Sequence, residues 1–265
     1  MIRLVMLVML LATGISFAEA DIAKIQVGEK ITGPLTVGKN TFSLPTGEWE
    51  LANVSTWDLI ICQHDCFASP QQKYDDMKTI QLIKTNKGKL VETMLIETPV
   101  NNTAHSLGKV NTRICDNKNG YFYTDFGSGY NLPECLRVYH AVNYYETGNL
   151  NKFNSTVKAY LDKNNIEIPR TVIQAQYFYA SERGHTGIRF AFNPEAAGFS
   201  PSTTKHWEVN EWHSKNQTPE QKKFSDQAVA WGKGMAATMQ KSIKENLVTP
   251  LPDFMAQSSQ PAQAQ

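Results

Sequence analysis

The sequence has almost no net charge, because 26 Lys and Arg residues are balanced by 25 Asp and Glu residues, which gives +1. Nucleic-acid-binding proteins usually carry a basic excess, so we expect no nucleic acid among the partners. The 16 glycines and 12 prolines among 265 residues are too few for a collagen-like or proline-rich chain. Charged residues make up only 19% and aromatic residues reach 10%, which argues against bulk disorder.

The sequence also lacks the short motifs that mark common catalytic and nucleotide-binding sites. It contains no P-loop, no G-x-G-x-x-G and no H-E-x-x-H. Gly127-Ser128-Gly129 does not have the spacing of a nucleophile elbow and lies in an Asn-rich stretch, so we interpret it as a turn. We therefore assign no catalytic residue and no cofactor from the sequence, and we favour a protein without enzymatic activity.

Residues 1–20 have the pattern of a secretory signal peptide. Arg3 supplies a short basic region, and an unbroken apolar run covers residues 4–12. Small residues suit cleavage after Ala18 or after Ala20. The run is shorter than the roughly 20 residues that span a bilayer, and no later segment is apolar enough to do so. We predict a soluble mature protein that is exported to the periplasm or secreted, without a transmembrane segment.

The rest of the chain is dominated by patterns typical of β-strands. Residues 22–61 are rich in β-forming residues, and residues 77–98 predict a hairpin whose turn uses Gly88. Further strands are predicted at residues 121–124, 136–144, 171–181 and 187–192. The strands cluster in runs instead of alternating with helices, which favours an antiparallel sheet.

Two segments in the C-terminal half have helical periodicity. Apolar residues recur at helical spacing over residues 150–161. A second, long helix is predicted from about Pro219 to Leu247, with Thr218 as its N-cap. We therefore predict an α+β fold, an antiparallel β-rich domain with one short and one long C-terminal helix.

The length is sufficient for one large domain or two small ones. We assign residues 21–255 to a single domain, and a subdivision near residue 146, where the helical pattern begins, stays open. Residues 256–265 are polar, and we predict that they form a disordered tail.

The long helix has an apolar stripe on one side and lysines on the other. The stripe consists of Phe224, Ala228, Trp231, Met235 and Met239. The basic side is formed by Lys222, Lys233 and Lys244. Such a helix either docks on a protein core or binds a membrane surface or a partner, and we favour docking on the core.

The four cysteines are Cys62, Cys66, Cys115 and Cys135. An even number in an exported chain indicates two disulfides, and four cysteines allow three pairings. We favour the sequential pairing, Cys62 with Cys66 and Cys115 with Cys135. In the alternative, Cys62, His64 and Cys66 bind a metal, because their alternate spacing places three soft ligands on one face of an extended segment.

Aromatic residues, histidines and carboxylates gather in one stretch near the long helix. The stretch contains His206, Trp207, Glu208, Glu211, Trp212 and His213. These residues can line a ligand pocket, but the same pattern is typical of an aromatic edge that packs on the sheet. We keep the pocket as a hypothesis beside the packing interpretation.

Several short stretches occur in an order found in other proteins. They are Leu44-Pro-Thr-Gly-Glu-Trp49, Pro169, Tyr177-Phe-Tyr179, Phe190–Gly198, Trp207, Trp212 and Ala230-Trp-Gly232. Together they resemble a group of secreted proteobacterial proteins of unknown function. The resemblance implies export and a single β-rich unit, and it implies no activity and no functional residue.

The sequence therefore favours an exported, non-catalytic protein that binds a ligand or associates with the cell envelope. Two alternatives stay open. One is a metal-binding protein that uses Cys62, His64 and Cys66. The other is a hydrolase of an envelope polymer, whose catalytic carboxylates or histidines are brought together only by the tertiary structure.

Overall fold

The structure of the protein is a computed structural model. It describes residues 19–61, 72–102, 113–127, 132–142, 145, 151–181, 184–245 and 247–255. The predicted signal peptide up to Ala18, the segment with Cys62, His64 and Cys66, and the tail from residue 256 lie outside the described residues.

Strands form most of the regular secondary structure, as the alternating patterns predict. They are β1 (Ala20–Asp21), β2 (Lys30–Ile31), β3 (Leu35–Val37), β4 (Asn40–Phe42), β5 (Trp49–Ile61), β6 (Gln72–Asn86), β7 (Lys89–Pro99), β8 (Phe122–Asp125), β9 (Glu134–Val142), β10 (Thr171–Ser181) and β11 (Gly184–Phe192). The helices are α1 (Arg113–Asp116), α2 (Lys152–Lys163) and α3 (Pro219–Glu245), and the 3-10 turns are η1 (Ile22–Lys24) and η2 (Pro194–Ala197).

One antiparallel sheet of eight strands runs through the molecule in the order β2-β5-β6-β7-β11-β10-β9-β8. A small sheet of β1, β3 and β4 lies beside it. The predicted hairpin joins β6 to β7, and its turn uses Lys87 and Gly88, both with positive φ. The predicted fold class is confirmed, with a short helix α2 and a long C-terminal helix α3 on the antiparallel sheet.

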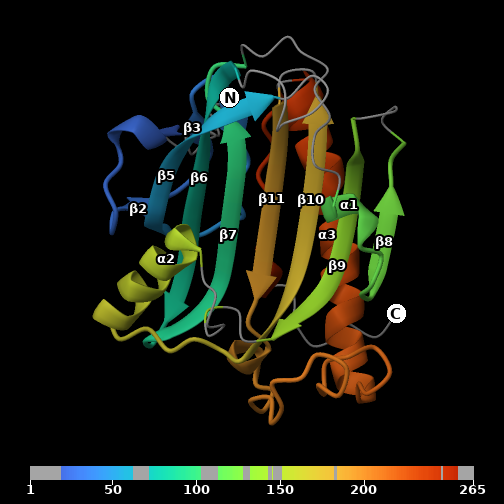
Figure 1. Cartoon of the computed structure of the whole chain (residues 1–265). Helices are drawn as coiled ribbons and strands as arrows, with labels where there is room; N and C mark the ends of the chain where they lie inside the picture. The colour runs from blue at the N-terminus through green and yellow to red at the C-terminus, as the bar shows by residue number, and fades with distance from the viewer. Residues whose placement is uncertain are drawn as a thin grey trace, which may run out of the picture.

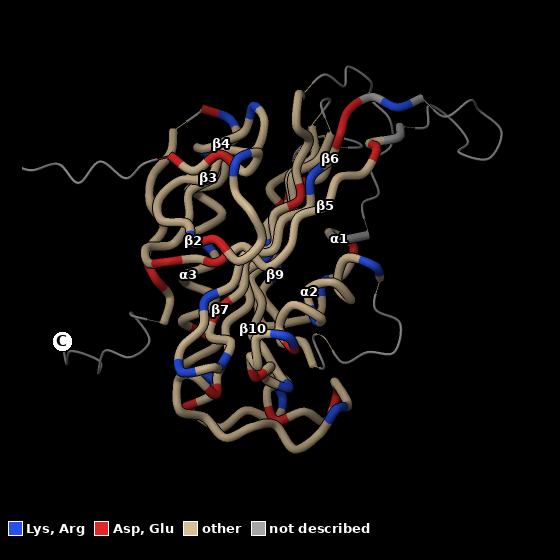
Figure 2. Tube along the Cα trace, turned by 90° about the vertical axis from the view of Figure 1, so that its left-hand side faces the viewer, with Lys and Arg blue, Asp and Glu red and all other residues tan. Residues whose placement is uncertain are grey.

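The two longer helices cover opposite faces of the large sheet (Figures 1 and 2). The short helix α2 packs on one face through Val157 and Leu161, which contact Ala52 and Ile83 in a small apolar cluster. It begins at Asn151, whose side chain accepts a hydrogen bond from the backbone of Asn154, as an N-cap does. On the other face, α3 and the small sheet enclose the main hydrophobic core.

Sequence features at both ends of its first turn explain where α3 begins. Thr218 Oγ1 accepts a hydrogen bond from the backbone N–H of Gln221, and the Gln221 side chain accepts one from the backbone N–H of Thr218. This reciprocal pair is a capping box, and Pro219 occupies the first helical position. All five residues of the predicted apolar stripe are buried, so the predicted docking of this helix on the core is confirmed.

The centre of the main core is an aromatic cluster between α3 and the sheet. Trp231 lies edge-on to Phe190 and Phe192, with ring centroids 4.8 and 5.0 Å apart. Phe254 belongs to the segment that follows α3, and its ring centroid lies 4.0 Å from that of Phe192. The Trp231 indole N–H also donates to the backbone carbonyl of Pro252 at 2.8 Å. The cluster therefore fixes both the helix and the chain that follows it.

Gly232 allows α3 to approach the sheet closely. A Cβ atom at this position would lie 3.2 Å from Val138 and 3.3 Å from Ala175, which is tighter than side chains normally pack. At the end of α3, Lys244 forms an ion pair with the buried carboxylate of Glu134 at 2.8 Å. Lys244, which belongs to the predicted basic side of the helix, therefore attaches the end of α3 to the sheet.

The predicted disulfide between Cys115 and Cys135 is confirmed, with a Cα–Cα distance of 5.7 Å. It ties α1 to the start of β9, beside Phe178 and Ala180. The predicted Cys62–Cys66 pair lies outside the described residues. None of the described helices combines the length and the hydropathy that crossing a bilayer requires.

We expect Trp231→Ala to lower the free energy of unfolding by about 3–5 kcal/mol, because the substitution leaves a cavity in the aromatic cluster. Urea unfolding of the purified protein measures this loss. Lys223→Ala, at an exposed position of the same helix, is the matched control and should change the value by less than about 0.5 kcal/mol. A loss below about 1 kcal/mol for Trp231→Ala would contradict the burial of the ring.

Candidate functional site

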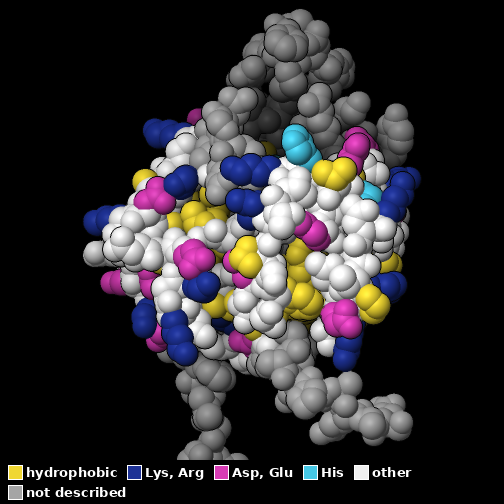
Figure 3. Space-filling model, turned by 90° about the horizontal axis from the view of Figure 1, so that it is seen from below, with side chains coloured by type: hydrophobic (Ala, Val, Ile, Leu, Met, Phe, Trp, Pro, Cys, Tyr) yellow, Lys and Arg dark blue, Asp and Glu magenta, His cyan; other side chains and the backbone are white. Residues whose placement is uncertain are grey.

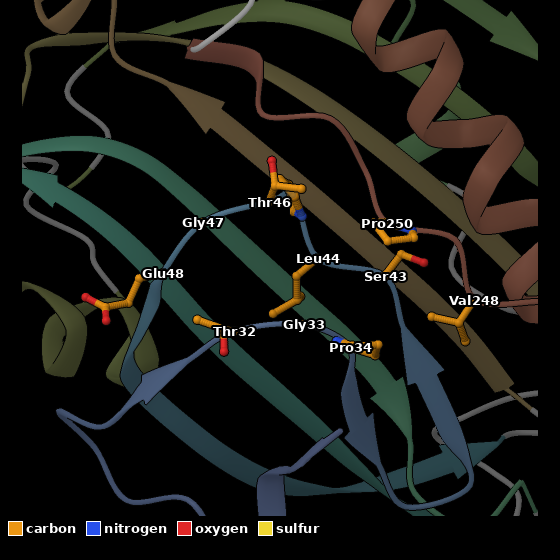
Figure 4. Close-up of a pocket in the computed structure, with 11 residues that line it drawn as sticks. Thr32, Gly33, Pro34, Ser43, Leu44, Thr46, Gly47, Glu48, Val248 and Pro250 are labelled. Carbon is orange, nitrogen blue, oxygen red and sulfur yellow. The ribbon is translucent and has the colours of Figure 1, made fainter. Parts of the chain in front are cut away.

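A largely apolar pocket of about 480 Å³ opens between the two sheets and the C-terminal segment (Figure 4). Three stretches of chain line it: residues 32–34 between β2 and β3, residues 43–48 between β4 and β5, and residues 248–250. We call it the 43–48 pocket. Its size and its mostly apolar lining are typical of small-molecule sites.

The floor of the pocket is buried and its walls are exposed. Ser43, Leu44 and Pro45 are buried, whereas Val248 and Pro250 form a wall that solvent reaches. In Figure 4 the Leu44 side chain points toward Gly33, on the opposite side of the hollow. The pocket therefore has an apolar interior that is open on one side.

Backbone hydrogen bonds hold the two distant walls together. Thr46 N donates to the carbonyl of Leu251 at 3.0 Å, and Leu251 N donates to the carbonyl of Leu44 at 3.3 Å. Gly47 adopts a φ of +110°, a conformation that residues with a side chain rarely adopt. The chain therefore bends at Thr46 and Gly47, and the partner of this loop is a segment about 200 residues later in the chain.

A buried ionic cluster supports the loop from below. Lys84 Nζ forms ion pairs with Glu92 at 2.9 Å and with Asp253 at 2.7 Å. It also donates to the carbonyl of Thr46 at 2.9 Å and lies 4.6 Å from the centre of the Trp49 ring. Burial raises the pKa of Glu92 and Lys84 opposes this effect. Lys84 therefore joins β6, the loop and the C-terminal segment.

The rim of the pocket is neutral overall. Glu48 is the one charged side chain among the described residues that line the pocket. Its carboxylate forms an ion pair with Lys30 at 2.6 Å. Both side chains are more than half exposed, so this pair contributes little to stability. Among the described residues that line the pocket, the only charged side chain therefore has a partner of opposite charge.

Ser43 is the polar group of the pocket floor. Its side chain is 1% exposed, and its hydroxyl oxygen has no hydrogen-bond partner. In Figure 4 the hydroxyl points toward the wall formed by Val248 and Pro250. A buried hydroxyl without a partner costs free energy, so a group that bonds to it would be stabilising.

The residues of the predicted aromatic pocket separate into two groups. Trp207 stacks on His140 of β9 with ring centroids 4.9 Å apart, and His213 lies edge-on to Trp207 at 4.6 Å. His140 Nε2 bonds the Trp207 carbonyl at 3.1 Å, and the Trp207 indole N–H donates to the His140 carbonyl at 3.3 Å. The three rings therefore pack against one another beside β9, which is the kind of arrangement that the packing interpretation describes.

The other members of that stretch lie elsewhere. Trp212 is buried beside Phe224 in the main core, and Glu211 accepts hydrogen bonds from the backbone and hydroxyl of Thr203. Both residues line a second, more polar hollow of about 440 Å³ at the start of α3. His206 and Glu208 are exposed.

One histidine and one carboxylate are in contact on the face of the sheet that α2 partly covers. His185 Nε2 lies 2.6 Å from Glu97 Oε1, and its ring stacks on Phe178 at 5.4 Å. A carboxylate that orients a histidine is one component of a general acid–base site. The hydrolase alternative stays a hypothesis.

The metal alternative is also untested, because Cys62, His64 and Cys66 lie outside the described residues. Within the part of the chain that the structure describes, no three His, Cys, Asp or Glu side chains are close enough to hold a metal ion together.

Comparison with known proteins finds no match to a family model, to a curated protein or to a solved structure.

Sequence reasoning missed the 43–48 pocket. Pro45-Thr46-Gly47 is typical of a turn, but nothing in the local pattern connects it with residues 248–250 or marks Ser43 as buried. The observable signals were the prolines and glycines of these loops, which exclude regular structure without indicating what the loops enclose.

We expect the protein to lose stability in mild acid, because His140 is buried in its neutral form. Burial, with smaller contributions from His213 and Arg137, lowers its pKa in the folded state to about 4, whereas an unfolded histidine has a pKa of about 6.5. Because the unfolded chain binds the proton first as the pH falls, the stability present above pH 6.5 is lost between about pH 6.5 and 4. The loss should reach about 2 kcal/mol at about pH 4.5.

Urea unfolding at neutral pH and at about pH 4.5 measures this loss. His140→Phe keeps an aromatic ring on Trp207 and cannot titrate, so it should lose about 2 kcal/mol less than the wild type over the same interval. Equal losses in the two proteins would show that another group carries the acid sensitivity.

Proposed function

We propose that this chain is an exported, non-catalytic binding protein that holds a small ligand in the 43–48 pocket. The observation that carries the proposal is the pocket itself, a hollow of about 480 Å³ with an apolar lining and one buried polar group at its floor. Binding sites for small molecules usually have this composition. The signal-peptide pattern of residues 1–20 supports export, to the periplasm or to the medium.

The disulfide supports the same compartment. Cys115 and Cys135 are joined in the structure, and such bonds persist in oxidising compartments such as the periplasm and the extracellular space. The charge distribution agrees with a small neutral ligand better than with a polyanion. On the face seen in Figure 3, Lys and Arg side chains are interspersed with Asp and Glu, with hydrophobic patches between them.

We expect the exported protein to begin at Glu19, which corresponds to cleavage after Ala18. The Glu19 carboxylate accepts hydrogen bonds from Thr36 and Thr41 of the small sheet. Ala20 begins β1, and its N–H donates to the carbonyl of Pro34 at 3.0 Å. Cleavage after Ala18 keeps these contacts, whereas cleavage after Ala20 removes them.

Intact mass and N-terminal sequencing of protein from the soluble exported fraction identify the first residue. A start at Asp21 would contradict the choice of cleavage site but not export. Membrane-bound protein that retains Met1 would contradict export.

We expect Thr32→Trp to block the 43–48 pocket. Thr32 is exposed at its wall, so the bulky ring can occupy the opening without disturbing the core. Solvent extraction and mass spectrometry of the purified protein should recover a small molecule from the wild type and none from the variant. Ser200→Trp, at an exposed position of the second hollow, is the matched control and should retain the molecule. Retention by Thr32→Trp, or an empty wild type, would contradict the proposal.

A further inference from the structure

The charge around the 43–48 pocket limits the class of ligand. Glu48 is its one charged lining residue among those described, and Lys30 already neutralises it at 2.6 Å. Lys84, behind the loop, is held by two carboxylates and the carbonyl of Thr46. A ligand anion would meet the Glu48 carboxylate without a free cation beside it, and a ligand cation would have to compete with Lys30. A charged group that entered the pocket would therefore lose its hydration without gaining a strong partner.

The apolar side chains that line the pocket indicate the chemistry of the larger part of the ligand. Pro34, Leu44, Val248 and Pro250 present hydrocarbon to the hollow. Burying apolar ligand surface against them is favourable at roughly 25 cal/mol per Å². The lining therefore suits a ligand whose bulk is hydrocarbon.

The pocket floor adds one polar requirement. The Ser43 hydroxyl is buried and unpartnered, and a serine hydroxyl can both donate and accept a hydrogen bond. It rotates about a single bond and can turn to a group that enters beside it. An alcohol, ester or amide group can satisfy it without bringing a net charge into the pocket.

We infer that the 43–48 pocket binds an uncharged amphiphile, with its apolar body against Leu44 and the proline walls and its single hydrogen-bonding group on the hydroxyl of Ser43. This inference rests on the proposed function, because it names the ligand class of the same pocket. In this inference, the hydrogen bond from Ser43 makes the pocket bind an alcohol differently from a chain without a hydrogen-bonding group.

Three probes of similar length test the inference: 1-octanol, 1-chlorooctane and octanoate. Chemical-shift changes at the backbone amides of Thr32, Gly33, Thr46 and Gly47 report binding in the pocket and give each dissociation constant. We expect 1-octanol and 1-chlorooctane both to bind, because both carry the apolar body. The contribution of Ser43 is measured for each probe by comparing the wild type with Ser43→Ala, because an alcohol gives up hydrogen bonds to water on binding and a chloroalkane does not. Octanoate should bind most weakly.

Ser43→Ala separates a role of Ser43 in ligand binding from a role in stability. Removing an unpartnered buried hydroxyl should leave the melting temperature of the free protein unchanged or raise it. The same substitution should weaken 1-octanol binding about threefold to tenfold and leave 1-chlorooctane binding unchanged. Ser202→Ala is the matched control, because Ser202 is also buried with an unpartnered hydroxyl but lies at the second hollow. It should not change the binding of any probe.

The outcomes separate the two proposals. If Ser43→Ala weakens 1-octanol binding no more than 1-chlorooctane binding, the assignment of Ser43 is overturned while the pocket remains a binding site. If octanoate binds most tightly, the ligand is anionic and the inference is overturned. If no probe shifts the pocket amides, the pocket is not a site for apolar ligands, and the proposed function fails with the inference.

Discussion

The rest of the structure depends on the burial of Trp231 between α3 and the eight-stranded sheet. Its ring contacts Phe190 and Phe192, and Phe254 from the following segment packs on the same cluster. Its indole N–H bonds the backbone of Pro252, so the docking of the helix also determines the course of the chain after it. That course brings residues 248–250 against the loop at residues 43–48 and thereby creates the pocket.

Around this apolar centre, buried charges act as specific connections. Glu134 accepts hydrogen bonds from Tyr177, Gln240 and Lys244, and so attaches the end of α3 to β9 and β10. Lys84 connects β6 with the pocket loop and with Asp253 near the C-terminus. Buried ion pairs contribute little net stability, but breaking one leaves an uncompensated charge. We therefore interpret both clusters as positioning elements that fix how the segments meet.

The residue types in a stretch of sequence did not show whether that stretch lines a pocket. Tryptophan, histidine and glutamate are common in functional sites, which draws attention to residues 206–213. In the structure, however, Trp207 stacks on His140, His213 lies edge-on to Trp207, and Trp212 is part of the core. The 43–48 pocket is lined largely by apolar residues such as Pro34, Leu44 and Val248. A site that binds a mostly apolar ligand depends on its shape and its hydrocarbon lining, and it leaves no catalytic motif in the sequence.

The sequence by itself determined most of the longer helices and strands of this protein. Alternation predicted the hairpin of β6 and β7 and the strands β10 and β11, and helical spacing predicted α2 and α3. The number and order of the cysteines favoured the Cys115–Cys135 pair among three possible pairings. These features depend on neighbours in the chain, because the periods of strands and helices and the preferences of caps and turns are local. Only the tertiary structure decided that β7 pairs with β11, that Lys84 joins Glu92 and Asp253, and that Ser43 lies beside Val248. Those contacts join residues far apart in sequence, and they follow from how whole faces of the sheet bury apolar area, which no local pattern records.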